Sequence, residues 1–351
     1  MVERPLISIV ILTFNGGRTI KETLDSVLAQ DHDNLEIIIV DNASTDGTIN
    51  EIQHRISLSQ TTAKIRIIVN EKNLGFSAGH NIGISESNGE YVLCTNQDVI
   101  LEQNFVSEAV KLFQQDEKIG AIQPKMLNRH NRKVIDSTGI MIFKSRRMVD
   151  RGQGEEDKGQ YEKIEEVFGA NGAAVFFRKE CLEDVCLRGR SSERLRGTTP
   201  ENSGEYWDED FFIYKEDVDL SWRIRLYGWK IMYCPTAIVY TERTTKPIGE
   251  KAGIGQIIKT RREQKQYVRY YSFKNHRLAM IKNDLPSLFF RHLPWILPRE
   301  IGAWLYVFLF EPKTWPAIRE LFKQMPGAWK KQKIIMANKK VGAGEMGRWF
   351  R

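Results

Sequence analysis

Apolar residues in the first hundred positions gather in short runs of strand length. Four such runs, rich in Val, Ile and Leu, cover Ile7–Phe14, Leu35–Val40, Lys64–Val69 and Tyr91–Cys94. Three of them are almost continuously apolar, which is typical of strands buried on both faces of a sheet. The runs therefore predict four strands of a buried, parallel sheet.

Segments with helical spacing lie between these runs. Thr19–Gln30 places its apolar residues on one helical stripe, and Thr19 with Glu22 has the pattern of a capping box. Ser77–Glu86 and Glu102–Gln115 also have the spacing of helices. Because strands and helices alternate, we expect an α/β protein with a doubly wound, mostly parallel sheet.

The pattern is less regular in the second hundred residues. Ala173–Phe177 and Ile231–Tyr240 predict two further strands, and the aromatic segment Trp207–Tyr214 predicts a third. Leu187–Tyr206 is polar and rich in Gly, Ser, Thr and Pro, which indicates a loop or an insertion. After Thr244 the chain becomes helical, basic and aromatic.

Polar residues follow each of the first four strand runs. They form the clusters Thr13–Asn15, Asp41–Ser44, Asn70–Gly75 and Asn96–Asp98. Asn and Asp favour turns, which explains some of this pattern. Ligands of doubly wound sheets bind outside the carboxyl ends of the strands. Four clusters at four successive strand ends therefore predict a binding site at that edge.

Three groups of carboxylates, two at these strand ends and one further along the chain, suggest specific chemistry. Asp41 ends a buried strand and could accept a hydrogen bond from the N3–H of a uracil or thymine ring, whereas Asp46 has the position of a helix N-cap. Asp98 could hold a divalent cation that neutralises a departing diphosphate. Glu216–Asp219 contains three carboxylates, one of which could take a proton from an attacking hydroxyl. Capping of a helix N-terminus explains one or two of those three.

These motifs, taken together and in this order, resemble family 2 glycosyltransferases, and most of all their rhamnosyltransferase-like branch. The resemblance covers about residues 5–245 and implies a GT-A fold, an inverting mechanism and a nucleotide-sugar donor. The motifs that carry it are Thr13–Asn15, Val40–Gly47, Asn73–Gly83, Asn96–Asp98 and Glu216–Arg223.

The resemblance also implies roles for individual residues. Asp217 would be the catalytic base and Asp98 the metal ligand of the DxD-type motif. Glu216 and Asp219 would assist in acceptor binding or in the local fold, and Trp222 would join them at the acceptor. The residues implied at the donor are Thr13, Phe14, Asn15, Asp41, Asn73, Gly75, Gly79, Asn81, Asn96, Gln97 and Gly172.

The chain departs from the family pattern at the metal site. Asn96 stands where many relatives have Asp, and the segment after the last strand contains no His. Glu242 could replace that His as an oxygen ligand, or Tyr240 could contact the diphosphate. A solvated charge is the alternative for Glu242. The implied cofactor is Mg²⁺ or Mn²⁺.

The same resemblance implies how the chain is divided. We expect a catalytic domain at 1–245, whose donor-binding half is about 1–100 and acceptor-binding half about 101–245. A helical, basic extension follows at 246–351. The expected partners are a dTDP- or UDP-sugar and a glycan or lipid-linked acceptor, in the synthesis of cell-surface polysaccharide.

Charge and apolar content refine this picture. The net charge is +7, and the last segment, Lys313–Arg351, has ten Lys and Arg against two Glu. The basic character belongs to the tail, which argues against nucleic acid as a partner of the main domain. Ile301–Phe310 is uncharged but too short to span a membrane. The aromatic and basic tail therefore predicts either contact with an anionic membrane surface or packing on the catalytic domain.

Cysteine spacing gives no sign of zinc or redox chemistry, because Cys94, Cys181, Cys186 and Cys234 form no CxxC pair. No cleavage pattern follows the apolar N-terminal run. We expect buried, reduced thiols in a cytoplasmic protein that contacts, at most, the inner face of the cell membrane.

Three other functions can be compared with the sequence. A non-transferring binder of nucleotide sugars on the same fold is compatible with the departures at the metal site. A Rossmann dehydrogenase is excluded, because Thr13–Arg18 is not GxGxxG. A nucleotidyltransferase is disfavoured, since no Gly-rich, Lys-containing phosphate loop follows the first strand.

Overall fold

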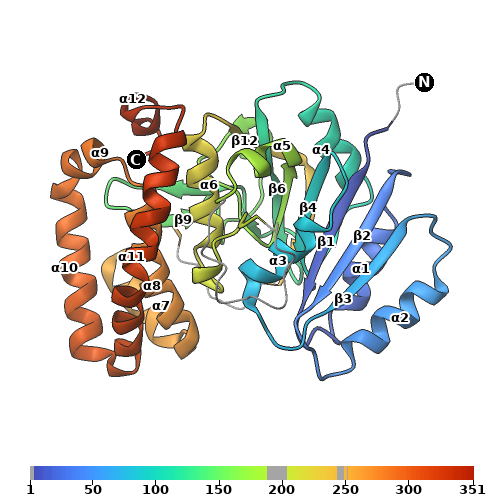
Figure 1. Cartoon of the computed structure of the whole chain (residues 1–351), viewed down its shortest axis with the longest axis horizontal. Helices are drawn as coiled ribbons and strands as arrows, with labels where there is room; N and C mark the ends of the chain where they lie inside the picture. The colour runs from blue at the N-terminus through green and yellow to red at the C-terminus, as the bar shows by residue number, and fades with distance from the viewer. Residues whose placement is uncertain (1–3, 188–203, 243–248, 251) are drawn as a thin grey trace.

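The computed structural model describes residues 4–187, 204–242, 249–250 and 252–351, and a mixed β-sheet forms its centre (Figure 1). The strands of the main sheet lie in the order β10-β12-β6-β11-β4-β1-β2-β3, with β5 paired to β12 and β7 paired to β6. The strand bounds are β1 Ile7–Thr13, β2 Leu35–Asp41, β3 Lys64–Val69, β4 Tyr91–Asn96, β5 Val99–Leu101, β6 Ile119–Asn128, β7 Ile135–Ser137, β8 Ile140–Ile142, β9 Met148–Asp150, β10 Glu165–Glu166, β11 Ala174–Arg178 and β12 Lys230–Thr241.

Helices cover both faces of this sheet, as the alternating pattern predicts. The helix bounds in the catalytic part are α1 Ile20–Leu28, α2 Thr48–Leu58, α3 Gly75–Ser85, α4 Phe105–Phe113, α5 Lys179–Asp184 and α6 Glu216–Leu226, with the 3₁₀ helix η2 at Glu209–Phe211. Alternate residues of β1 enter different cores: Ile9 packs with α1 and α4, and Val10 packs with α3 and α6. This two-residue period is what a strand buried on both faces requires.

The predicted parallel pairing is confirmed for the first four strands. β1 pairs in parallel with β2 and β4, and β2 pairs in parallel with β3. The register aligns Thr13 with Asp41 and Asp41 with Val69, so the predicted polar clusters meet at one edge. β3 lies at the border of the sheet and is half exposed, which explains its less apolar sequence.

Two local predictions are wrong. The Thr19 side chain does not cap α1, and Glu22 forms an ion pair with Arg129 at 2.6 Å instead of closing a capping box. Trp207–Tyr214 is not a strand but contains η2, because Asp208 accepts a hydrogen bond from the Asp210 amide and turns the chain. Most of the predicted loop Leu187–Tyr206 lies outside the described residues.

The segment after residue 246 is helical, as predicted, and packs closely against the rest of the molecule. Leu285 and Ile335 belong to the same hydrophobic core as β1 and α6, and the ring centroids of Trp222 and Phe350 are 5.9 Å apart. The helix bounds there are α7 Ile254–Glu263, α8 Gln266–Asn283, α9 Pro286–Arg291, α10 Leu293–Phe310, η3 Pro312–Thr314, α11 Trp315–Asn338 and α12 Ala343–Gly347. The two predicted parts therefore share one core.

The four cysteines are free and buried, which confirms the prediction of reduced thiols. Across the described part of the chain, no helix combines the length and apolar character that crossing a bilayer demands.

Candidate active site

The carboxyl ends of β1 and β4 are joined by a polar side chain. The hydroxyl of Thr13 donates to Gln97 Oε1 at 2.6 Å, and the amide of Phe14 donates to the same oxygen at 2.7 Å. Gly16 lies so close to Gln97 that a Cβ there would overlap it. The structure thus brings together Thr13, Phe14 and Gln97, three residues that the sequence assigns to the donor site.

The ends of β1 and β2 are joined in a similar way through Asn15 and Asp41. Asn15 Oδ1 accepts from the Thr45 amide at 2.9 Å, and the Asn15 amide donates to Ser44 Oγ at 2.8 Å. Asp41 is fully buried, and its two oxygens accept from the Ser44 amide at 2.8 Å and hydroxyl at 2.5 Å. The N3–H of a uracil or thymine ring would therefore donate to an Asp41 oxygen that already accepts a hydrogen bond from Ser44.

The start of α3 is held against a segment that is distant in sequence. Asn73 Oδ1 accepts from the Gly75 amide at 2.8 Å, and the Phe76 amide donates to the Phe212 carbonyl at 2.6 Å. Gly75 has φ +85°, and a Cβ there would lie 2.5 Å from the Phe212 ring. Only glycine meets both demands without strain.

Two residues assigned to the donor pocket lie instead within the packing of α3. Gly79 faces Leu12, and a Cβ at Gly79 would overlap that side chain. Asn81 is buried, and its amide group donates to the Trp207 carbonyl and accepts from the Trp207 amide, both at 2.8 Å. The geometry gives these residues a role in attaching α3 to its neighbours.

Carboxylates gather near the turn that carries Asp98. Burial raises the pKa of Asp98 to about 6, and the nearby charges of Glu242 and Asp136 add to this effect, while Arg129 opposes it. Glu242 Oε1 lies 3.1 Å from His130 Nε2. The Tyr240 hydroxyl donates to Glu102, so it is already bonded within the protein.

The sequence pattern did not identify His130 or Asp136, because both come from the hairpin that follows β6 and neither lies in a recognisable motif. Within residues 4–187, 204–242, 249–250 and 252–351, no three His, Cys, Asp or Glu side chains are grouped to hold a metal ion. One or two carboxylates are nevertheless enough for Mg²⁺ or Mn²⁺ when a diphosphate supplies the other ligands. The like-charged carboxylates around Asp98 fit such a cation.

A short loop before β11 joins Asp217 to the end of β4. The Asn96 amide donates to the Ala173 carbonyl at 3.0 Å, and the Gly172 amide donates to Asp217 Oδ2 at 3.4 Å. A Cβ on Gly172 would lie 3.3 Å from the Asp217 Cβ, so the backbone approaches the carboxylate closely. The Asn96–Asp98 turn and Asp217 are therefore connected through one loop.

The electrostatics of Asp217 suit a proton acceptor. Burial raises the pKa of Asp217, Lys215 opposes this, and the charge of Asp150 adds to it. Asp150 itself accepts from the Asn171 amide group at 2.8 Å. A carboxyl group whose pKa is raised binds a proton more strongly than a solvated one, which is what a general base requires.

The residues assigned to the acceptor lie in different environments. Glu216 is buried, and burial followed by the charge of Asp217 raises its pKa well above the ordinary value. Asp219 is fully buried and accepts from Lys282, Asn283 and Arg223. Trp222 is 1 % exposed and packs in the core. The contacts of Asp219 and Trp222 give them a role in the local fold and leave no surface for an acceptor.

The chain immediately before Asp217 has a strained backbone. Phe212, Tyr214 and Lys215 have φ values of 63°, 69° and 71°, which residues other than glycine adopt rarely. Asn275 of α8 holds this segment, because its amide group donates to the carbonyls of Phe211, Ile213 and Tyr214 at 2.8, 2.9 and 2.7 Å. No sequence motif marks Asn275, which lies about sixty positions further along the chain.

Replacing Asn275 with Leu is expected to lower kcat between about tenfold and about a hundredfold and to change donor affinity little. Leu has a similar volume but removes the hydrogen bonds from Asn275 to this segment, and each buried carbonyl that stays unpaired costs about 1–3 kcal/mol. Steady-state kinetics together with a melting curve would check this. Asn338→Leu, on the exposed end of α11, is the matched control. Full kcat in a destabilised Asn275→Leu protein would show that the hydrogen bonds of Asn275 contribute to folding alone.

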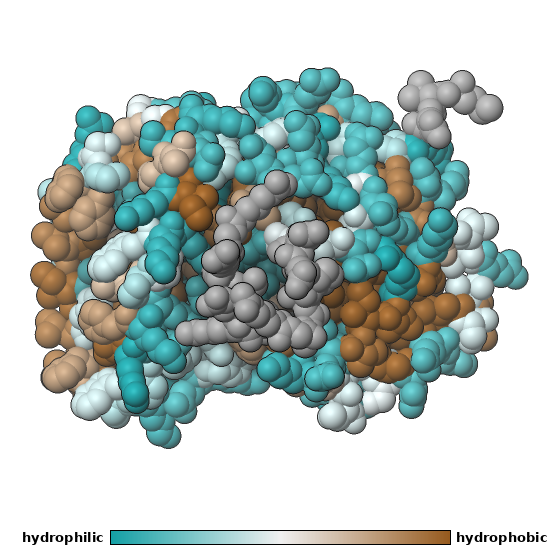
Figure 2. Space-filling model, in the orientation of Figure 1, coloured by the Kyte–Doolittle hydropathy of each residue, from teal (hydrophilic) through white to brown (hydrophobic). Residues whose placement is uncertain are grey.

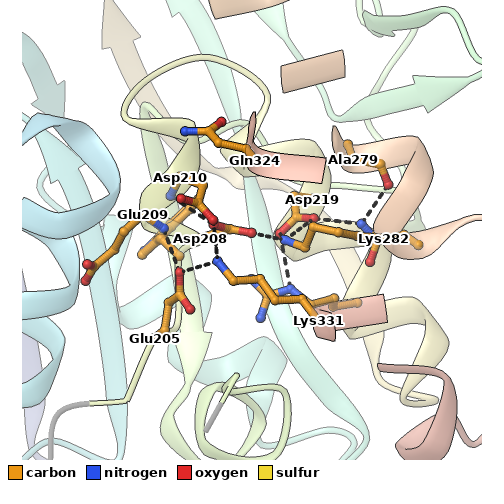
Figure 3. A network of polar contacts seen from close by, with 12 residues as sticks. Glu205, Asp208, Glu209, Asp210, Asp219, Ala279, Lys282, Gln324 and Lys331 are labelled. Atoms are coloured by element: carbon orange, nitrogen blue, oxygen red, sulfur yellow. Dashed lines mark hydrogen bonds and ion pairs between the residues drawn. The ribbon is translucent and has the colours of Figure 1, made fainter. Parts of the chain in front are cut away.

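A buried ionic cluster lies beside the same segment (Figure 3). Lys282 of α8 donates to Asp208 and to Asp219, and Lys331 of α11 donates to Asp208 at 2.6 Å and to Glu205 at 2.7 Å. Burial acts to raise the pKa of Asp208, but the two ammonium groups bring it well below its ordinary value. The C-terminal helices therefore fix residues 205–219 through charge as well as packing.

This combination of a mostly parallel sheet, polar strand ends and a carboxylate at the start of α6 defines a glycosyltransferase of the GT-A class. The sequence matches Glycosyl transferase family 2 over residues 8–185, just over half of its length, and the chain belongs to this family.

Sequence relatives include the poly-β-1,6-N-acetyl-D-glucosamine synthase of Staphylococcus aureus. It is 24 % identical over 238 residues, which are 67 % of this chain and 49 % of the synthase. The chain thus spans about half the length of the curated relatives it matches.

Solved structures with the same fold include a mannosyltransferase from Pyrobaculum calidifontis in complex with GDP-Man and Mn²⁺. Its TM-score is 0.51 at 19 % identity, covering 96 % of this chain and 86 % of that one. TarS from S. aureus has a TM-score of 0.55 at 15 % identity, covering 95 % of this chain and 50 % of TarS.

Proposed function

We propose that the protein is an inverting hexosyltransferase that moves a sugar from a dTDP- or UDP-sugar to a hydroxyl group of a growing glycan. One observation carries this proposal: the loop of Gly172 and Ala173 hydrogen-bonds both Asp217 and the end of β4. A hydroxyl beside Asp217 would thus face a donor held at the strand ends. It would attack the anomeric carbon as Asp217 takes its proton, and the bond from that carbon to the diphosphate would break.

The donor contacts in this proposal follow the strand-end geometry. Thr13, Asn15 and Asp41 would hold the nucleotide, while Asn73 and Gly75 would line the pocket. Asn96, Gln97 and Gly172 would lie toward the sugar. Support comes from structural neighbours with the same fold, since TarS has been solved with UDP-GlcNAc and the archaeal mannosyltransferase with GDP-Man. Rhamnose or a related hexose is the sugar we propose.

Asp98 and Glu242 would hold Mg²⁺ or Mn²⁺ in this proposal, with His130 beside Glu242. The cation would neutralise charge on the departing diphosphate. Support comes from the cluster of like charges around Asp98, and from the neighbours solved with Mn²⁺. Asn96 offers a neutral oxygen where a second carboxylate would be more favourable for a divalent cation.

The proposed setting is the synthesis of cell-surface polysaccharide at the inner face of the cell membrane, with a glycan or lipid-linked saccharide as acceptor. The name of the S. aureus relative, a poly-N-acetylglucosamine synthase, supports a polysaccharide product. The positive charge of the tail suits an anionic surface better than a neutral one.

A screen of nucleotide sugars by thermal shift tests the donor, because ligands that bind the folded state raise Tm. We expect a dTDP- or UDP-sugar to raise Tm more with Mn²⁺ than without it, and Asp98→Asn to remove that difference. Since the pKa of Asp98 is raised to about 6, it is ionised above that pH and protonated below it. The Mn²⁺-dependent part of the shift should therefore decline as pH falls through 6.

Release of the nucleoside diphosphate decides between transfer and binding alone. A donor that binds but is neither hydrolysed nor transferred, with Mn²⁺ present and a panel of saccharide acceptors, would identify a non-transferring binder. If no dTDP- or UDP-sugar raises Tm, the proposed donor class is wrong.

A further inference from the structure

The exposed face of α10 contains no polar side chain. Every residue of α10 that is exposed is apolar, proline or glycine, although the helix lies on the outside of the molecule (Figure 1). Isolated exposed apolar residues are normal, but a whole helix face without one charge is not. These exposed residues are Pro294, Trp295, Leu297, Pro298, Ile301, Gly302, Leu305, Phe308, Leu309 and Phe310.

The polar residues of α10 point the other way, toward α8. Arg299 lies 2.8 Å from His276 Nε2, and Glu300 forms an ion pair with Arg277 at 2.7 Å. A helix on the surface of a water-soluble domain normally turns its charges outward and its apolar stripe inward. The reversed arrangement of α10 indicates that its outer face contacts an apolar medium rather than water.

The apolar face continues onto α11. The rings of Phe308 and Trp315 stack with centroids 5.4 Å apart. Trp315, Phe322 and Trp329 are all exposed and recur every seven residues, which places them on one side of α11. Figure 2 shows apolar residues gathered along the edge of the molecule that α10 forms in Figure 1. We call the exposed residues of α10 together with Trp315 the α10 face.

Cations stand at both ends of the α10 face. Lys144 Nζ lies 5.5 Å from the centre of the Trp295 ring, and Arg291 is exposed just before the helix. At the other end Arg262 lies beside the Tyr306 hydroxyl, and Lys313 is exposed. An apolar helix face bordered by Lys, Arg and Trp has the chemistry of a helix lying in the headgroup region of an anionic bilayer.

The charge of the tail argues against a second copy as the occupant. Residues 313–351, which follow α10, carry ten Lys and Arg against two Glu, so a second copy docked on the α10 face would bring two basic tails close together. An anionic surface would instead be attracted. The helix has 18 residues and a length of about 27 Å, and it is bonded to α8 along its inner side, which suits lying on a bilayer rather than crossing it.

We propose that the α10 face is a membrane-docking surface that inserts its apolar side chains among the headgroups of an anionic phospholipid bilayer, with Arg262, Arg291 and Lys313 facing the phosphates. The proposal rests on the helix alone and does not depend on the identity of the donor or on transfer. It would place the active site at a fixed height above the lipid surface.

Vesicle sedimentation of the full chain tests this, without donor or acceptor. We expect binding to phosphatidylcholine vesicles that contain phosphatidylglycerol, and weaker binding to pure phosphatidylcholine or at high salt. The double variant Leu305→Glu/Phe308→Glu should bind at least about tenfold more weakly, because both side chains would place a charge in the apolar layer. The control Leu58→Glu/Ile164→Glu changes two exposed apolar residues elsewhere and should bind like the parent protein.

All four side chains are exposed, so we expect both double variants to fold, and melting curves check this. No binding of the parent protein to anionic vesicles would overturn the proposal, as would equal binding by the two double variants. Light scattering tests whether a second copy of the chain binds the α10 face instead. A dimer in solution that Leu305→Glu/Phe308→Glu converts to a monomer would overturn the membrane proposal in favour of contact between copies.

Discussion

Replacing Asp217 with Asn is expected to lower the rate of sugar transfer by about 10² to 10⁴-fold while donor binding stays intact. The amide keeps the size of the carboxyl group, and its oxygen can still accept from the Gly172 amide, but it cannot take a proton from the acceptor hydroxyl. Turnover of the donor, measured beside the donor-induced shift in Tm, separates the two effects.

The pH profile gives a second measure of the same role. Burial raises the pKa of Asp217, so the carboxylate is ionised, and able to accept a proton, only above that raised value. The rate should therefore fall as pH decreases through the pKa. Asp33→Asn, at an exposed carboxylate that pairs with Arg4 on the surface, should leave rate and profile unchanged. Retained turnover in Asp217→Asn would show that Asp217 is not the general base.

Replacing Lys282 with Met is expected to lower the free energy of unfolding by about 3–5 kcal/mol. The side chain of Lys282 is fully buried between Asp208 and Asp219, and Met would leave those carboxylates without the ammonium group (Figure 3). Denaturant unfolding at neutral pH measures the loss. Lys323→Met, an exposed lysine on α11 beside Glu320, should change stability by less than about 0.5 kcal/mol.

The loss should also depend on pH. Because the folded-state pKa of Asp208 lies well below its ordinary value, its contribution to stability is present above the unfolded pKa and is lost as pH falls through the folded pKa. The variant and the parent protein should therefore converge in stability in strong acid. A Lys282→Met protein as stable as the parent at neutral pH would show that water or a nearby cation replaces the ammonium group.

The sequence predicts the first four strands and their parallel order because each carries its own local signal. A continuous apolar run marks burial on both faces, and the polar residue that ends it marks the functional edge. The parallel register of the structure then places Thr13 beside Asp41 at that edge.

Contacts between distant segments could not be predicted in this way. Asn275 and Lys282 lie on a helix whose periodicity is poor, because its buried face carries polar residues that serve the 205–219 segment. Trp207–Tyr214 has the composition of a strand, yet the hydrogen bond within Asp208–Asp210 and the bonds to α8 override that preference.

Residue type alone does not predict the contacts that a motif residue makes inside the fold. Asn81 and Trp222 occur in motifs of the family, but the structure uses Asn81 to bind the Trp207 backbone and Trp222 to fill the core. Asp219 is similar, since its charge is matched by Lys282 and Arg223. The hydrogen bonds, ion pairs and packing of such side chains are visible only in the folded structure.

The buried ionic cluster has a consequence for the order in which the enzyme becomes competent during synthesis. Residues 205–219 leave the ribosome before α8 and α11, which supply Lys282 and Lys331. Lys282 and Lys331 follow Asp208 by 74 and 123 residues, and until they emerge Asp208 lacks both ammonium groups and cannot be buried at acceptable cost. The strained turn before Asp217 is held by Asn275 of α8, which also emerges later, so we expect the nascent chain to form β1 to β4 before this turn is fixed.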